Sequence, residues 1–440
     1  MKQKKYLAAL ERGVEHWNKW RKNNSSINPD LKGINLSGHI LIGIDFRGVN
    51  LAGANLIKSN LGSSNLDGAN LTEASLTGAS LTGASLTGAN LTGANLTKAN
   101  YRGAELNSAN LSLANLAYAD LRAIDFTAAE LSGANFSHAN LNGANFMAAK
   151  LTRCNFELAS LQKADFTNAN LTRARLNRAN LERGNLNQAN LTEADLFEAN
   201  LTQASLIKAD LTEANLSGAN LTGANLLKSD LTQAFLTEAN LSEADLILAN
   251  LREADLSHAN LTKANLSQAN LADARAPIAN FDRSILTGAC VENLQINHQT
   301  SFGRVSCKYL YLKNFQEYRI PEDSNKHLTL NQFKSILESL LGSVNLVFDT
   351  DINWTAFLNS FENLKLQYNS QAIEIKAVEV LPNRRFLVKI NVVPDLEINE
   401  IRKYFWQKYN RALATLERDK PVPQEDFKQH NRQLNIYEQN

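Results

Sequence analysis

Cysteine, proline and methionine are scarce in this chain of 440 residues, which contains three, seven and two of them. The cysteines, Cys154, Cys290 and Cys307, lack the close pairing in sequence that metal ligands show. Cys154 takes the place of a small core residue, as expected for a protein from a reducing compartment. The sequence therefore predicts no cysteine metal site.

Long apolar runs are also missing. No segment approaches the roughly 20 apolar residues of a transmembrane helix. The N-terminal residues contain several lysines, but Glu11 and Arg12 interrupt any apolar stretch, which argues against a secretory signal. We therefore expect a cytoplasmic protein without a membrane span. The net charge of +1 gives no reason to expect nucleic-acid binding.

Catalytic motifs are absent from the sequence as well. It contains no phosphate-binding loop, no dinucleotide fingerprint, no nucleophile elbow and no paired metal motif. These absences predict a protein that is not an enzyme and that binds no cofactor.

A regular repeat occupies the chain from Leu31 to Leu286. A large apolar residue, usually Leu, returns at every fifth position, and Ala usually stands two residues before it, as in the ANLTG unit of residues 89–93. A period of five fits neither a helix nor a flat strand. The chain must therefore turn at every unit, and stacked units would bury the Leu side chains in one continuous core, as in a solenoid.

The spacing of unusual residues predicts the number of units in each coil. Phe126, Phe146 and Phe166 are 20 residues apart, and so are Phe136 and Phe156. A coil of 20 residues holds four units. We therefore expect the phenylalanine rings to form two stacks on opposite sides of the core.

This stretch, with its A-(N/D)-L-x-x unit, resembles the pentapeptide-repeat family. The resemblance implies a mainly β fold, a right-handed quadrilateral β-helix in which the central Leu or Phe and the preceding Ala point inward. For this chain it implies about 13 coils.

The segments on either side of the repeat have a different composition. We expect a capping helix over Tyr6–Lys22 and a linker within residues 1–30, and the β-helix over residues 31–299. Irregular cover is expected over residues 300–327, a small α+β domain over 328–417, and a polar tail over 418–440. Within the domain, the patterns predict helices over residues 330–341, 354–368 and 397–417, strands over 344–348, 373–381 and 386–393, and a turn at Pro382 and Asn383.

Charge varies along the repeat. A basic band contains Arg153, Arg173, Arg175, Arg178 and Arg183, whereas eleven acidic and three basic residues follow between positions 191 and 258. The pattern fits either a solvated surface that keeps the rod in solution or a surface that steers a charged partner.

An apolar column is the second surface feature. The residue after each central position is usually Thr, Ser or Asn and should point to solvent, but Ile207, Leu227 and Ile247 stand there 20 residues apart, with Leu248 beside the last. Clustered exposed apolar residues mark interaction sites, so these four residues form a candidate protein-docking strip. A ladder that only stabilises neighbouring coils remains the alternative.

These features together predict a non-catalytic solenoid scaffold that binds an unidentified protein partner. Some members of the family resemble duplex DNA in shape and charge and inhibit type II topoisomerases, and such inhibition is the alternative function. The basic band and the separate C-terminal domain argue against it.

Overall fold

The computed structural model describes residues 2–297, 299–313, 317–329, 331–333, 336–337, 343–348, 351–368, 373–381, 385–392 and 398–416. The chain divides into two compact units. The first comprises Met1–Glu292 with Ser301–His327 and contains the repeat, and the second comprises Asn293–Thr300 with Leu328–Asn440.

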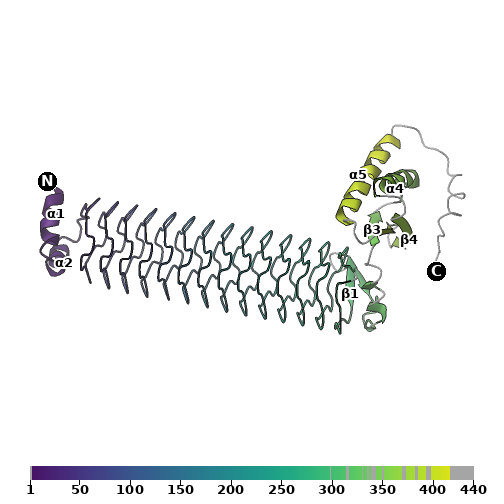
Figure 1. Ribbon diagram of the computed structural model, residues 1–440, viewed down its shortest axis with the longest axis horizontal. Coiled ribbons are helices and arrows are strands. Elements are labelled where there is room, and N and C mark those ends of the chain that lie inside the picture. The colour runs from purple at the N-terminus through teal and green to yellow at the C-terminus, as the bar shows by residue number, and fades with distance from the viewer. Residues whose placement is uncertain are drawn as a thin grey trace. The chain divides into compact units, whose positions relative to one another are not determined.

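Hydrogen bonds between coils run through the whole repeat with a fixed offset. Parallel bridges join Asn90 to Asn110 and Asn110 to Glu130, and the same 20-residue step recurs from Asp30 onward. The N–H of Leu91 donates to the carbonyl oxygen of Asn110 at 2.6 Å. Four units therefore make one coil, which confirms the predicted period, and Figure 1 shows the coils as a stack.

Two side chains of every unit fill the interior. In the unit of residues 89–93, Ala89 and Leu91 are buried, Asn90 and Gly93 are exposed, and Thr92 is half-buried. Burial of the Ala and Leu positions repeats along the stack, and the position of Asn90 is half-buried in most other units. Stacking thus buries one large and one small side chain from each unit, which gives every coil a similar interior volume.

Each unit ends in a turn that changes the direction of the chain. The N–H of Ala94 donates to the carbonyl oxygen of Leu91 at 2.9 Å, which closes a turn around Thr92 and Gly93. The second turn residue has a positive φ, 67° at Gly93. Glycine adopts this conformation without steric penalty, which explains its frequency there.

The four turns of a coil define four corners, which we name after one coil. Corner A contains Ser112 and Leu113, and corner B contains Ala117 and Tyr118. Corner C follows with residues 122 and 123, and corner D with residues 127 and 128. Every residue 20 positions away belongs to the same corner.

The phenylalanine rings in the core form the two predicted stacks. Ring centroids lie 5.1 Å apart between Phe126 and Phe146, and 4.7 Å apart between Phe146 and Phe166. The second stack has 4.9 Å between Phe136 and Phe156. Rings of the two stacks meet edge to face at 5.8–6.1 Å, an arrangement favoured by the quadrupoles of the rings.

The N-terminal segment differs from the single predicted helix. It contains α1, Lys2–Leu10, and α2, Val14–Asn23. Gly13 lies between them with a φ of 95°, which a continuous helix cannot accommodate. The expectation of one helix over Tyr6–Lys22 was therefore wrong, because glycine at this position separates two short helices.

The helix α2 contacts the first coil through buried side chains. Trp17 is fully buried and its indole N–H donates to the carbonyl oxygen of Asp45 at 2.7 Å. The Arg21 guanidinium donates to the carbonyl oxygens of Ile27 and Arg47, each at 2.5 Å. These contacts satisfy backbone acceptors at an end of the stack where no further coil can pair (Figure 1).

The opposite end of the repeat is more regular than predicted. Bridges from Asn280 to Ser301 and from Ile285 to Ser306 continue the coil after one inserted residue. Two antiparallel strands follow, β1 over Leu310–Lys313 and β2 over Glu317–Ile320. The expectation of irregular cover was therefore wrong for residues 301–320, because the backbone keeps its coil pairing as far as Tyr311 and then forms β1 and β2 although the Ala and Leu pattern has ended.

Among its described residues, the second unit contains an antiparallel sheet and the helices α4 and α5. Its elements are β3, Ser343–Phe348; α4, Trp354–Tyr368; β4, Ile373–Leu381; β5, Arg385–Val392; and α5, Ile398–Leu416. The strand order is β3-β5-β4. One buried cluster joins side chains of strands and helices, among them Val344, Phe357, Ile390 and Phe405. These elements follow the predicted pattern closely.

Some predictions for this unit fall on residues outside the described ranges. The predicted helix over residues 330–341 lies partly outside them, and the turn at Pro382 and Asn383 and the tail over 418–440 lie wholly outside them. None of the helices in the described part of the chain is both long and apolar enough to span a membrane.

The interior stacks yield a stability prediction. Phe146 is fully buried between rings of both stacks, so Phe146→Ala should lower the free energy of unfolding by about 3–5 kcal/mol. Phe235 provides the matched control because its ring is 52% exposed, and Phe235→Ala should change that free energy by less than about 0.5 kcal/mol. Chemical denaturation of both variants measures the difference, and equal losses would contradict the assigned interior.

Candidate protein-interaction surfaces

The candidate docking strip lies along corner D. Ile207, Leu227 and Ile247 are first turn residues of three successive coils, because the N–H of Lys208 donates to the Leu227 oxygen and that of Lys228 to the Ile247 oxygen, each at 2.9 Å. The turn itself is fixed by the preceding side chains, as the Asp245 carboxylate accepts from the N–H of Ile247 at 3.1 Å. The three side chains therefore form one column.

The exposure of this strip is lower than predicted. The three first turn residues are half-buried rather than directed fully to solvent, and only Leu248 is exposed, at 39%. The first turn position is half-buried in most coils, so the three residues of the strip share the usual exposure of this position. The exposed lysines Lys208 and Lys228 lie at the second turn position of the same corner and form no ion pair within the described residues.

Several arginines of the basic band form ion pairs with carboxylates of neighbouring coils. Arg173 donates two hydrogen bonds of 2.8 Å to the carboxylate of Glu193 in the next coil. Arg178 donates to Glu198 at 2.7 Å. Two of the five arginines of the band are therefore neutralised by acidic residues that begin the acidic stretch.

The remaining arginines of the band differ in their partners. Arg175 donates to Glu157 at 3.1 Å, and Arg183 donates to the side-chain oxygen of Gln203 at 2.9 Å. Arg153 forms no ion pair within the part of the chain that the structure describes, although its charge helps to lower the pKa of Glu193. Pairs of this kind on an exposed surface add little to stability, so their main effect is on the surface charge.

Hydrogen bonding at the Arg173 pair shifts both ionisation equilibria. The bonds from Arg173 lower the pKa of the Glu193 carboxyl below its ordinary value. The same bonds raise the pKa of the guanidinium. Both groups therefore stay charged at neutral pH, and the pair persists wherever the carboxylate is ionised.

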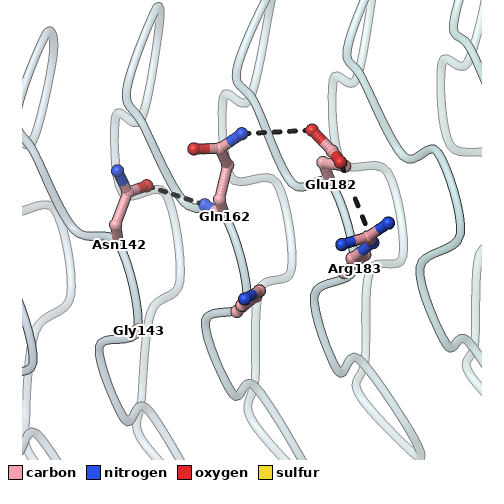
Figure 2. Close-up of a pocket in the computed structure, with 6 residues that line it drawn as sticks. Asn142, Gly143, Gln162, Glu182 and Arg183 are labelled. Carbon is pink, nitrogen blue, oxygen red and sulfur yellow. Dashed lines mark hydrogen bonds and ion pairs between the residues drawn. The ribbon is translucent and has the colours of Figure 1, made fainter.

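A polar hollow lies on corner C (Figure 2). It has a volume of about 470 Å³ and is lined by Asn142, Gly143, Gln162, Lys163, Glu182 and Arg183. The Asn142 side-chain oxygen accepts from the backbone N–H of Gln162 at 2.9 Å, and the Gln162 amide donates to Glu182 at 3.1 Å. Asn142, Gln162, Glu182 and Arg183 are thus already engaged with one another, and one lysine, Lys163, does not make a converging set of groups for a ligand.

Some exposed apolar residues that were not predicted from the sequence lie at corners A and B. Leu113 is 69% exposed, Tyr118 56% and Leu158 43%. The rings of Tyr118 and His138 are stacked, with centroids 4.7 Å apart and planes within 5°. The signal was present in the sequence, because residues 118, 138 and 158 share the 20-residue period at the second turn position.

Bulky residues at that position adopt an unfavourable backbone conformation. Tyr118, His138 and Leu158 have φ values of 58–59°, in the left-handed region. This conformation costs an L-residue with a Cβ roughly 1–2 kcal/mol. Gly133 and Gly143 occupy equivalent turn positions nearby, so the fold does not require bulky side chains there.

Metal-binding and reactive groups do not converge in the described part of the chain. No group of three or more His, Cys, Asp or Glu side chains there is arranged to hold a metal ion. Cys154 is buried, and burial raises the pKa of its thiol to about 12. Its thiol therefore stays protonated near neutral pH and is a poor nucleophile.

Comparison with known families identifies the repeat. The pentapeptide-repeat model matches residues 30–68, 54–93, 64–103, 89–127, 249–288 and 264–297, and the pentapeptide-repeat-region model matches residues 119–196. The chain belongs to the pentapeptide-repeat family. A search of curated proteins gives no significant match.

Solved structures of cyanobacterial pentapeptide-repeat proteins resemble parts of the chain. HetL from Nostoc sp. strain PCC 7120, a protein involved in heterocyst differentiation regulation, is 28% identical, with 62% of this chain and 95% of HetL covered and a TM-score of 0.17. The Nostoc protein alr5209 is 30% identical, with 28% and 84% covered and a TM-score of 0.19. Rfr23 from Cyanothece 51142 is 38% identical, with 24% and 64% covered and a TM-score of 0.12.

The pairing of the basic band yields a prediction on anion binding. Glu193→Gln together with Glu198→Gln should release Arg173 and Arg178, so this variant should elute from heparin at higher salt than the wild type. Glu73→Gln with Glu238→Gln is the matched control, because it changes the net charge equally but removes carboxylates without an ion pair in the described structure. An equal shift for both variants would show that net charge alone governs retention.

Proposed function

We propose that this protein is a non-catalytic scaffold whose repeat docks protein partners along its corners. The regular interior supports this proposal, since it holds the outward residues in fixed columns that a partner could recognise as a rigid surface. The observation that carries it is the column of Ile207, Leu227 and Ile247, where three successive coils depart together from the usual polar residue.

The surroundings of the strip resemble the centre and rim of a protein interface. The half-buried aliphatic column continues into the exposed Leu248, and Lys208 and Lys228 supply free charges on one flank. Apolar contact at the centre with charges at the rim is the usual composition of such interfaces. An exposed apolar edge next to unpaired charges is hard to explain by stability alone, whereas a docked partner would bury it.

The test restores the ordinary repeat residue. The double variant Ile207→Thr, Leu227→Thr should keep the fold, because Thr stands at this position in many coils, but should lose partners that the full-length wild type recovers from its native cells. Thr212→Ser with Thr232→Ser at corner A is the matched control and should recover the same partners as the wild type. If the strip variant also retains every partner, the column serves only as a ladder between coils.

Topoisomerase inhibition is the second candidate function. An acidic column at corner A supports it, because such a column could imitate a line of phosphates; it contains Glu193, Glu213 and Glu253, with the neutral Gln233 between the last two. Against it, Arg173 pairs with Glu193 and Arg252 pairs with Glu253, which interrupts the negative charge. A supercoiling assay with purified gyrase separates the two functions, since a scaffold without this activity should give no inhibition at molar excess.

A further inference from the structure

A second apolar surface lies along corner B, on coils that precede the docking strip. Tyr118, His138 and Leu158 are exposed second turn residues of three successive coils. Backbone hydrogen bonds of 3.0 and 2.9 Å, from Tyr118 to Ser137 and from His138 to Glu157, fix this succession. The stacked rings of Tyr118 and His138 therefore continue into Leu158 as one exposed column.

The side of the coil next to this column is flat and polar. It presents Asn115, Asn135 and Asn155, whose amides are linked by hydrogen bonds of 3.2 Å from each coil to the one before. On the far border, Leu113 is exposed and lies over Gly133, where a Cβ would come within 2.8 Å of the leucine side chain. The apolar column thus stands beside a rigid ladder of amides.

Two basic residues without an ion pair in the described structure flank the same surface. Lys98 precedes Tyr118 in the corner B column, and Arg153 lies at corner A; both are exposed and without an ion pair in the described structure. The carboxylate of Glu157, at the first turn position of the same corner, is already paired with Arg175. A partner with carboxylates would therefore find free cations here and no competing free acid.

We propose that corner B binds an acidic amphipathic α-helix of another protein, with the helix axis along the stack of coils. Its apolar stripe would contact Tyr118, His138 and Leu158. Its acidic flank would lie over the asparagine ladder, with carboxylates near Lys98 and Arg153.

The repeat distances of the two structures support a helix as the occupant. Neighbouring coils are separated by about 4.8 Å, the spacing of hydrogen-bonded strands. Apolar residues of a helix stripe alternate between three and four positions, which gives a mean rise of about 5.2 Å. Over the two steps from Tyr118 to Leu158, the positions of the helix residues and of the coils differ by only about 1 Å. In an extended strand, residues on the same face are about 6.7 Å apart. They would therefore not stay aligned with the coils over the same distance.

The backbone conformation of the column also supports a role beyond the fold. All three residues hold a left-handed conformation that glycine would adopt more easily, and they expose apolar surface as well. Both features oppose stability and solubility of the free rod. A partner that covers the column offsets the second of them.

This surface is independent of the corner D strip. The two columns occupy different corners and different coils, residues 118–158 against 207–248, and share no side chain. A failure of one proposal therefore leaves the other in place.

The test uses the full-length chain and a fluorescein-labelled synthetic helix. The probe carries Leu at positions i, i+4 and i+7 with Glu along one flank, and two control peptides replace Glu with Lys or scramble the Leu positions. Fluorescence anisotropy should show that the acidic probe binds at least about tenfold more tightly than either control.

Variants of the protein locate the binding site. Tyr118→Gly with Leu158→Gly introduces the residue that this turn position favours, so the repeat should fold normally while the affinity for the probe falls about tenfold or more. Gln188→Gly with Gln268→Gly makes the same kind of change at corner D, outside the docking strip, and should leave the affinity unchanged.

Three outcomes would overturn the proposal. These are no binding of the acidic probe, equal binding of the acidic and Lys peptides, and an affinity that the corner B double variant retains. Sedimentation with phosphatidylserine vesicles is the further comparison. If the wild type binds the vesicles but not the probe, a lipid surface rather than a helix is the occupant.

Discussion

Pairing of every coil with the next one through parallel backbone hydrogen bonds is the constraint on which the rest of the repeat depends. The bridges hold a 20-residue step over most of the repeat. This step requires that each unit bury its Ala and Leu and turn by the same amount, so insertions within the repeat would disrupt the core. The inward residues are therefore nearly uniform, and the variation that can carry function lies in the outward positions.

The same constraint makes the turn residues informative. The second turn residue has a positive φ in nearly every unit, whatever its side chain. Where glycine is replaced by a long charged residue, the side chain often reaches a neighbouring coil, as Arg173 reaches Glu193 in the next coil and Lys263 reaches Glu243 in the preceding one. Such ion pairs partly offset the free-energy cost of the strained backbone. Tyr118 and Leu158 have no charged partner of this kind, and a docking role accounts for them better than stability does.

The sequence predicted the interior well because the interior is governed by one period. The 20-residue coil and the two phenylalanine stacks follow from spacing alone and are confirmed. The ends were predicted less well, because they depend on local breaks in the pattern: Gly13 divides the N-terminal segment into two helices, and one inserted residue lets the last coil continue to Tyr311. The loss of free charge in the basic band was missed because its partners lie 20 residues away, although that same period could have revealed them.

Both docking columns depend most directly on the proximity in space of residues that are 20 positions apart in sequence. In a variant without the native cysteines, Thr212→Cys and Thr232→Cys would place two thiols in successive coils, at a strand spacing of about 4.8 Å that a disulfide can bridge. Thr212→Cys with Thr222→Cys is closer in sequence but lies at two different corners, A and C, of one coil. Mild oxidation of the folded protein should close the first pair and leave the second open. A disulfide in the second pair, or none in the first, would contradict the 20-residue coil and with it both docking columns.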